Sequence, residues 1–130
     1  MDTIEFLLPF PPSVNHYYVQ ARHHSGKYIS AKGSQFRKLV SDSIHEQVPG
    51  VCVSTPMLLE VVLYMPDKRE RDLDNYQKAL LDAITHAGLW TSDSLIDQLF
   101  IYRGVSETRG GSVFVRITPA GPVLPDGMRP

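Results

Sequence analysis

The residues best suited to chemistry lie in one stretch, MPDKRERDLDNYQKALLDAITHAGLWTSD, which runs from Met65 to Asp93. Asp72 and Asp74 stand two residues apart, where a charged run passes into a helical pattern, and Lys78 follows one helical turn later. Hard divalent cations prefer carboxylate oxygens and keep coordination positions for water and phosphate. Three aspartates and a lysine around one short helix could therefore hold a metal ion and support phosphoryl-transfer chemistry.

Local geometry favours bringing part of this set together. Residues two apart in an extended segment point the same way, so Asp72 and Asp74 would converge on one ion if their segment is extended. Lys78 lies on the helix face of Asp74, where an ammonium could stabilise charge developing on phosphorus or orient a water. Asp93 would have to return near the helix start through the neighbouring strand, which the sequence permits.

Each of these residues also has an ordinary structural interpretation. Asp74 with Gln77 matches an N-terminal capping box, and the helix macrodipole favours an aspartate at that end. Lys78 could pair with Asp74 or Asp82 at i,i+4 spacing, and Asp93 could be a turn residue. Asp82, in mid-helix, is expected to form a surface pair. Residue types alone leave both the metal site and these structural roles open.

The elements that must position this stretch follow from hydrophobic periodicity and turn residues. Ser30 is a plausible N-cap for a helix, and Gly88 suits the position after the end of a second helix. Alternating apolar residues predict strands, and the last two strands are expected to form a hairpin with a long loop. The pattern predicts strands over 3–8, 57–65, 95–102 and 112–118, helices over 31–47 and 75–87, and a loop over 13–18.

This order of elements predicts one α+β (mixed α/β) domain, with a mixed β-sheet covered by two helices. The chain has 130 residues, which is typical of a single domain. The predicted domain covers 1–118, and the proline- and glycine-rich segment 119–130 is expected to be a flexible tail.

Composition excludes several classes of protein. The chain has one cysteine, Cys52, so an intramolecular disulfide and a Cys/His zinc site are both excluded. It has no run of about 18 apolar residues and no secretory signal pattern, so we expect a cytoplasmic protein without a membrane span.

Positive charge is gathered locally, although the formal net charge is only -1. One basic stretch covers 22–38, and Lys68, Arg69 and Arg71 form a second cluster that Glu70 interrupts. Such runs are either solvated surface or phosphate-facing patches, and the second role needs the two clusters to meet in space. Tyr17 and Tyr18 could likewise pack in the core or stack on bases.

The chain resembles the RusA-type Holliday-junction resolvases, small endonucleases of bacteria and their phages, from about Ile4 to Thr118. The resemblance rests on LPFPPSVNHYY, on MPDKRERDLDNYQKALLDAITHAGLW and on the aspartate that follows. It implies a homodimer that resolves four-way DNA junctions by paired nicks with Mg²⁺, or with Mn²⁺ as a substitute. The catalytic and metal-binding acids implied are Asp72, Asp74 and Asp93, the essential lysine is Lys78, and Asn75 is expected to support the site.

The DNA and dimer contacts are expected on other residues. An apolar surface on 95–102 or at the Leu89–Trp90 corner is a candidate dimer contact. Two alternatives to a junction resolvase stay open, a branched-DNA-binding module without turnover and a nuclease that acts on other branched DNA. The candidate DNA-binding residues are Lys27, Lys68, Arg69, Arg71, Asn15 and Tyr17.

Overall fold

The computed structural model describes residues 2–20 and 26–121 of the chain. Most of the predicted tail, and Arg22, His23 and His24 of the basic stretch, lie outside the described residues. No helix in the described ranges is long and apolar enough to cross a membrane. The elements are β1 (Ile4–Pro9), α1 (Val14–Tyr17), β2 (Tyr18–Gln20), β3 (Lys27–Ile29), α2 (Ala31–Gln47), β4 (Met57–Tyr64), α3 (Asp74–Ala87), the 3-10 helix η1 (Asp93–Leu95), β5 (Ile96–Arg103) and β6 (Ser112–Pro119).

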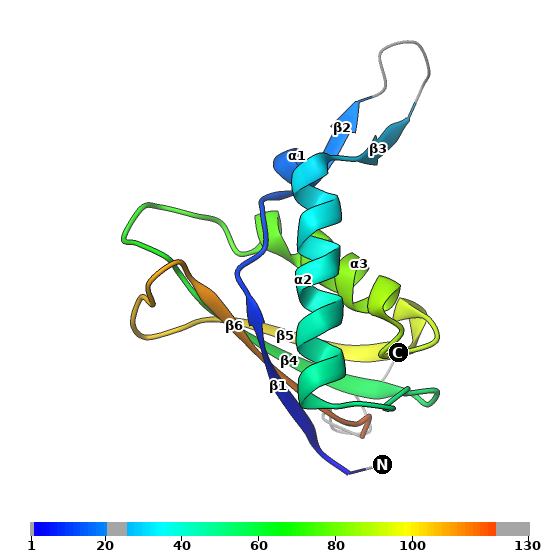
Figure 1. Cartoon of the computed structure of the whole chain (residues 1–130). Coiled ribbons are helices and arrows are strands. Elements are labelled where there is room, and N and C mark those ends of the chain that lie inside the picture. Colours follow the sequence, from blue (N-terminus) through cyan, green and yellow to red (C-terminus); the bar gives the residue numbers. More distant parts are fainter. Residues whose placement is uncertain (1, 21–25, 122–130) are drawn as a thin grey trace, which may run out of the picture.

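Four strands form one mixed sheet in the order β1-β6-β4-β5 (Figure 1). β4 and β5 run parallel, whereas β6 is antiparallel to both β1 and β4. The parallel pair is joined through α3, which makes a β4–α3–β5 crossover unit. The helix of such a unit runs back along the sheet, so α3 begins near the end of β4 and finishes near the start of β5. The predicted α+β domain with a mixed sheet is confirmed.

The predicted hairpin between the last two strands is wrong. β5 and β6 lie on opposite sides of β4, where Val62 has Tyr102 of β5 as one partner and Phe114 of β6 as the other. Glycines in the connecting loop can reverse the chain, but they do not decide which strands become neighbours. The apolar pattern of β4 lets it occupy the centre of the sheet and accept a partner on each edge.

One face of the sheet packs against α2 and α3. The side chains of β4 alternate between buried and half-buried, and Glu60 lies on the wetter side, as predicted. The buried face of β4 joins one core with Phe36, Val40 and Ile44 of α2 and with the apolar stripe of α3. Burial of these apolar side chains supplies the main driving force for folding. The ends of α3 are thereby held in place against the sheet. The residues of β4 that form this face are Met57, Leu59, Val61 and Leu63.

The opposite face of the sheet carries an apolar row. Leu7, Phe114, Val62 and Tyr102 are neighbours across all four strands, and the side chains of Leu7 and Tyr102 are 56% and 47% exposed. The Leu89–Trp90 corner, the other predicted apolar surface, is buried. Of the two predicted dimer contacts, only the strand over 95–102 keeps large apolar side chains exposed.

The segment predicted as a loop over 13–18 contains the short helix α1, and β2 follows it directly. β2 pairs with β3 in a separate antiparallel ribbon, which projects beyond the N-terminal end of α2 (Figure 1). Ser30 caps α2 as predicted, because its Oγ accepts a hydrogen bond from the Gly33 N–H at 2.9 Å. The same hydroxyl donates to the carbonyl of Tyr17 at 3.0 Å, which joins α1 to the start of α2.

Candidate active site and nucleic-acid interface

Asp72 and Asp74 lie at the start of α3, and both are exposed. Leu73 between them has helical dihedral angles (φ −60°, ψ −39°), so the extended segment that would align the two carboxylates is not present. The two aspartates are close in the chain, and the extended backbone on which their convergence on one ion depended is absent at Leu73.

The predicted capping box at this end of α3 is also absent. The N-cap position is occupied by Leu73, and no side chain there makes a capping hydrogen bond. The first turn is closed by backbone bonds instead, from the Asn75 N–H to the Asp72 carbonyl at 3.3 Å and from Tyr76 N–H to the Leu73 carbonyl at 3.3 Å. Asp74 therefore has no capping role that would compete with a role in a site.

Asp93 lies at the other end of the crossover unit. It begins η1 immediately before β5, and the first residue of β5, Ile96, pairs with the first residue of β4. Arg71, which precedes Asp72, is instead bonded through its carbonyl to Arg103 at the last position of β5. The 14 residues of α3 extend about 21 Å between the two ends. Asp93 therefore lies beyond the far end of α3, and β5 returns the chain toward the start of α3 only after Asp93.

The three aspartates accordingly do not form one metal site within the chain. Among residues 2–20 and 26–121, no group of three or more histidine, cysteine or acidic side chains lies close enough to hold an ion. The donor chemistry still fits Mg²⁺, because this ion often uses one or two carboxylates and completes its shell with water and phosphate. None of the three aspartates takes part in an ion pair with another described residue.

Lys78 follows one turn into α3, and its side chain is exposed. Neither of the predicted ion pairs, with Asp74 or with Asp82, is formed between the described side chains. The Lys78 Nζ lies instead over the ring of Tyr18, 5.4 Å from its centroid. Sequence reasoning missed this cation–π contact because the two residues are 60 positions apart (78 − 18).

Tyr17 is buried, and it belongs to a polar network that joins three helices. Its side chain is 0% exposed, which favours the packing role over stacking on a base. The Tyr17 hydroxyl donates to Asp82, and the Arg37 guanidinium donates to the same carboxylate at 2.8 Å. Burial opposes ionisation of Asp82, but the hydrogen bonds from Tyr17 and Arg37 hold its pKa below the usual value. Asp82 is thus a partly buried structural acid rather than a simple surface pair.

Two arginines of the loop between β4 and α3 have different surroundings. The Arg71 guanidinium donates two hydrogen bonds to the Asp67 carboxylate, of 2.6 and 3.2 Å, and the Arg71 side chain is only 13% exposed. Hydrogen bonding from the Arg71 side chain, together with the bond from the Arg69 N–H, lowers the pKa of Asp67 to about 2. The Arg69 side chain is 77% exposed and reaches Asp67 at only 3.5 Å. Arg71 therefore shapes the loop, and Arg69 remains available to a ligand.

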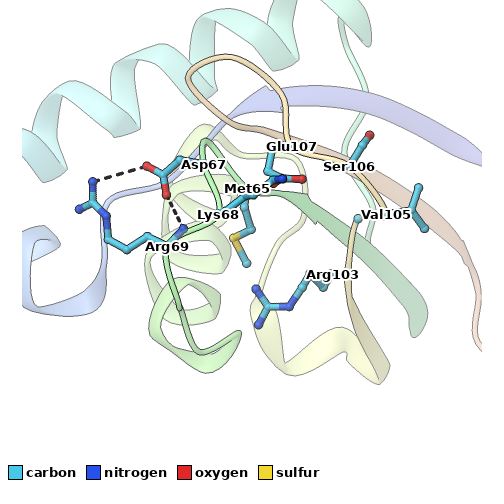
Figure 2. Close-up of a pocket in the computed structure, with 9 residues that line it drawn as sticks. Met65, Asp67, Lys68, Arg69, Arg103, Val105, Ser106 and Glu107 are labelled. Carbon is cyan, nitrogen blue, oxygen red and sulfur yellow. Dashed lines mark hydrogen bonds and ion pairs between the residues drawn. The ribbon is translucent and has the colours of Figure 1, made fainter.

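A pocket opens between this loop and the loop that follows β5 (Figure 2). Lys68 and Arg69 line it from the first loop, and Arg103 lines it from the end of β5. Sequence reasoning missed Arg103, because a single cation at a strand end gives no local signal. Val105, which also lines the pocket, is fully exposed. The two acids of the pocket, Asp67 and Glu107, leave it with a small excess of positive charge.

The remaining predicted site residues are Asn75 in α3, Asn15 in α1 and Lys27 in β3. Asn75 and Asp72 line the same hollow, so these two residues lie close together. Asn15 is exposed on α1, and Lys27 is exposed at the start of β3. The early basic stretch and the β4–α3 loop are on different elements, and no described contact joins them.

The fold and these residues define a class of protein. Exposed aspartates and a lysine at a helix start are residue types that metal-assisted cleavage of phosphodiester bonds uses, the acids as ligands and the lysine as a positive charge near the phosphate.

Comparison with known proteins identifies the family. The family model described as Endodeoxyribonuclease RusA matches residues 9–118. Proteins of Escherichia coli strain K12 and of Enterobacteria phage 82, each named crossover junction endodeoxyribonuclease RusA, are 40% identical over 124 residues, which cover 93% of this chain and 98% of theirs. A protein of the same name from Escherichia coli O139:H28 is 37% identical over 122 residues, with the same coverage. The chain belongs to the RusA endodeoxyribonuclease family.

Proposed function

We propose that the protein is a metal-dependent, structure-selective DNA endonuclease that resolves four-way junctions by paired nicks. The observation that carries the proposal is similarity to crossover junction endodeoxyribonucleases along nearly the whole length of both chains. The exposed acids and lysine at the start of α3 are consistent with it. A DNA substrate of bacterial or phage origin would place the protein in the bacterial cytoplasm.

Mg²⁺ is the proposed cofactor, with Mn²⁺ as a substitute, and Asp72, Asp74 and Asp93 are the residues that would hold it. A bound Mg²⁺ would supply Lewis acidity and lower the pKa of a coordinated water. The Lys78 ammonium would offset negative charge that develops on the scissile phosphate. Asn75, beside Asp72, would orient that carboxylate.

The separation of the acids supports a homodimer. Asp93 lies at the opposite end of the crossover unit from Asp72, so it cannot join Asp72 on one ion without a large rearrangement of the core. A second copy of the chain can supply its own Asp93 to the start of α3. A two-fold arrangement would create two such shared sites. Two equivalent sites are what paired nicks in a nearly two-fold junction require.

The proposed DNA contacts follow the exposed cations. Lys68, Arg69 and Arg103 surround one pocket, and Lys27 is exposed on the β2–β3 ribbon. Each phosphate contact would release counterions and make binding depend on salt. Arg71 is removed from this set because its guanidinium is engaged by Asp67.

A branched-DNA-binding module without turnover is the second candidate. The absence of an assembled acid cluster among the described residues favours it. A module of this kind binds junctions with a steep salt dependence and gives no cleavage product with any metal. A nuclease for other branched DNA differs only in its preferred substrate.

The test is cleavage of an end-labelled synthetic four-way junction in Mg²⁺, in Mn²⁺ and in EDTA. Symmetric nicks that require metal are expected, with linear duplex and flap substrates cut much more slowly. Asp72→Asn is expected to abolish cleavage while it preserves junction binding, and Asp97→Asn is a matched control at another exposed acid. A shifted but uncut junction would instead support the binding module, and preferred cleavage of flaps would support the third alternative.

A further inference from the structure

The ring of Tyr18 forms a rigid surface beside the start of α3. Tyr18 follows α1 directly and begins β2, and its side chain is half-buried. Its ring packs edge-on against Tyr17, with 4.7 Å between the centroids and an interplanar angle of 79°. Tyr17 is itself fixed by burial and by its hydrogen bond to Asp82. The orientation of the Tyr18 ring is therefore set by the core.

The Lys78 ammonium lies against this ring. A lysine side chain has a flexible four-carbon stem, so an exposed lysine without a partner samples many rotamers. A cation within about 6 Å of an aromatic centroid is attracted by the ring quadrupole, and the Lys78 Nζ is 5.4 Å from that of Tyr18. The contact restricts the ammonium without pairing it to a carboxylate, so its charge stays available to a phosphate.

We propose that Tyr18 is a positioning residue, whose ring holds the Lys78 ammonium where it can meet the scissile phosphate. The inference rests on the proposed function, because it assigns a partner to the lysine of that site. Tyr18 also pairs with Ile29 in the β2–β3 ribbon, which carries the proposed DNA contact Lys27. The ring that holds the lysine thus belongs to the same ribbon that would contact DNA.

The test compares Tyr18→Leu, which removes the aromatic face, with Tyr18→Phe, which keeps it. Single-turnover cleavage of the junction is measured at saturating protein, and junction affinity is measured separately in EDTA. Tyr18→Leu is expected to slow cleavage by about tenfold or more with unchanged affinity. Tyr18→Phe is expected to cleave at nearly the wild-type rate. Tyr28→Leu, on the paired strand, controls for loss of an aromatic side chain from the ribbon.

A double-mutant cycle separates positioning from general structural damage. In a Lys78→Ala background, Tyr18→Leu is expected to cause no further loss, because the group that it positions is gone. Equal losses in both backgrounds, unimpaired Tyr18→Leu protein, or an equal loss in Tyr18→Phe would each overturn the inference. Thermal unfolding confirms that the variants fold. If wild-type protein cuts no junction, the proposed function fails first, whereas wild-type cleavage with normal Tyr18→Leu activity contradicts this inference alone.

Discussion

Mixing two inactive variants, Asp72→Asn and Asp93→Asn, is expected to restore cleavage if the site is shared between two copies. The prediction follows from the crossover unit, in which Asp72 precedes α3, Asp93 follows it, and α3 is about 21 Å long. A carboxylate oxygen must approach Mg²⁺ to about 2 Å, so movement of side chains alone cannot close that gap. Within one chain the two acids cannot serve the same ion, but two chains can exchange them.

The size of the restored activity follows from symmetry. In a shared site, the mixed dimer has one site that carries both substitutions and one site that carries neither. After random exchange about half of the dimers are mixed, so about one quarter of the sites are intact. Each mixed dimer has a single working site, so it is expected to nick one strand and not two.

A supercoiled plasmid with a cruciform reports this difference, because one nick gives an open circle and paired nicks give a linear product. The two variants carry different tags, so that mixed dimers can be isolated by two affinity steps. Each variant alone is expected to be inactive, and Asp97→Asn is the active control. Mixed dimers as inactive as their parents would refute the shared site, and full activity of Asp93→Asn alone would remove Asp93 from the site.

Three further outcomes are expected. Gly33→Ala should lower the urea midpoint despite the better helix propensity of alanine, because a Cβ would lie 2.5 Å from the carbonyl oxygen of Tyr17; an unchanged midpoint would contradict that close approach. Asp67→Asn should be less stable than the wild type at neutral pH. This difference should vanish as the pH falls below about 3.9 and through about 2, because the pKa of Asp67 is depressed in the folded state; thermal unfolding of both proteins against pH measures this. Arg69→Met should reduce the salt slope of junction binding by about 0.9 per lost contact, whereas Arg71→Met should leave the slope unchanged and loosen the loop; equal slopes for both variants would contradict this division of roles.

Local signals in the sequence predicted much of the fold. The helix over 31–47 has the predicted bounds because a serine cap and a periodic apolar face act within a few residues of one another. The strand at Met57 follows from its alternating pattern, and the end of α3 follows from Gly88, which adopts a positive φ of 85°. The residues that carry the family resemblance lie mainly in two continuous stretches, 8–18 and 65–90, so they were recognisable before their arrangement was known.

Contacts between distant segments were decided by the tertiary structure. The pairing of β5 with β4, rather than with β6, turns β4, α3 and β5 into a crossover unit, and no local pattern contains that choice. The folded loop likewise distinguishes Arg71, which Asp67 holds and whose side chain is half-buried, from Arg69, whose side chain is 77% exposed and reaches Asp67 only at 3.5 Å, although both are simply cations in the sequence. Local propensity acts through bonds and turns a few residues long, whereas strand order and side-chain partners depend on how the whole core packs. The sequence by itself determined which residues can do chemistry, and the packing of the chain decided which of them meet.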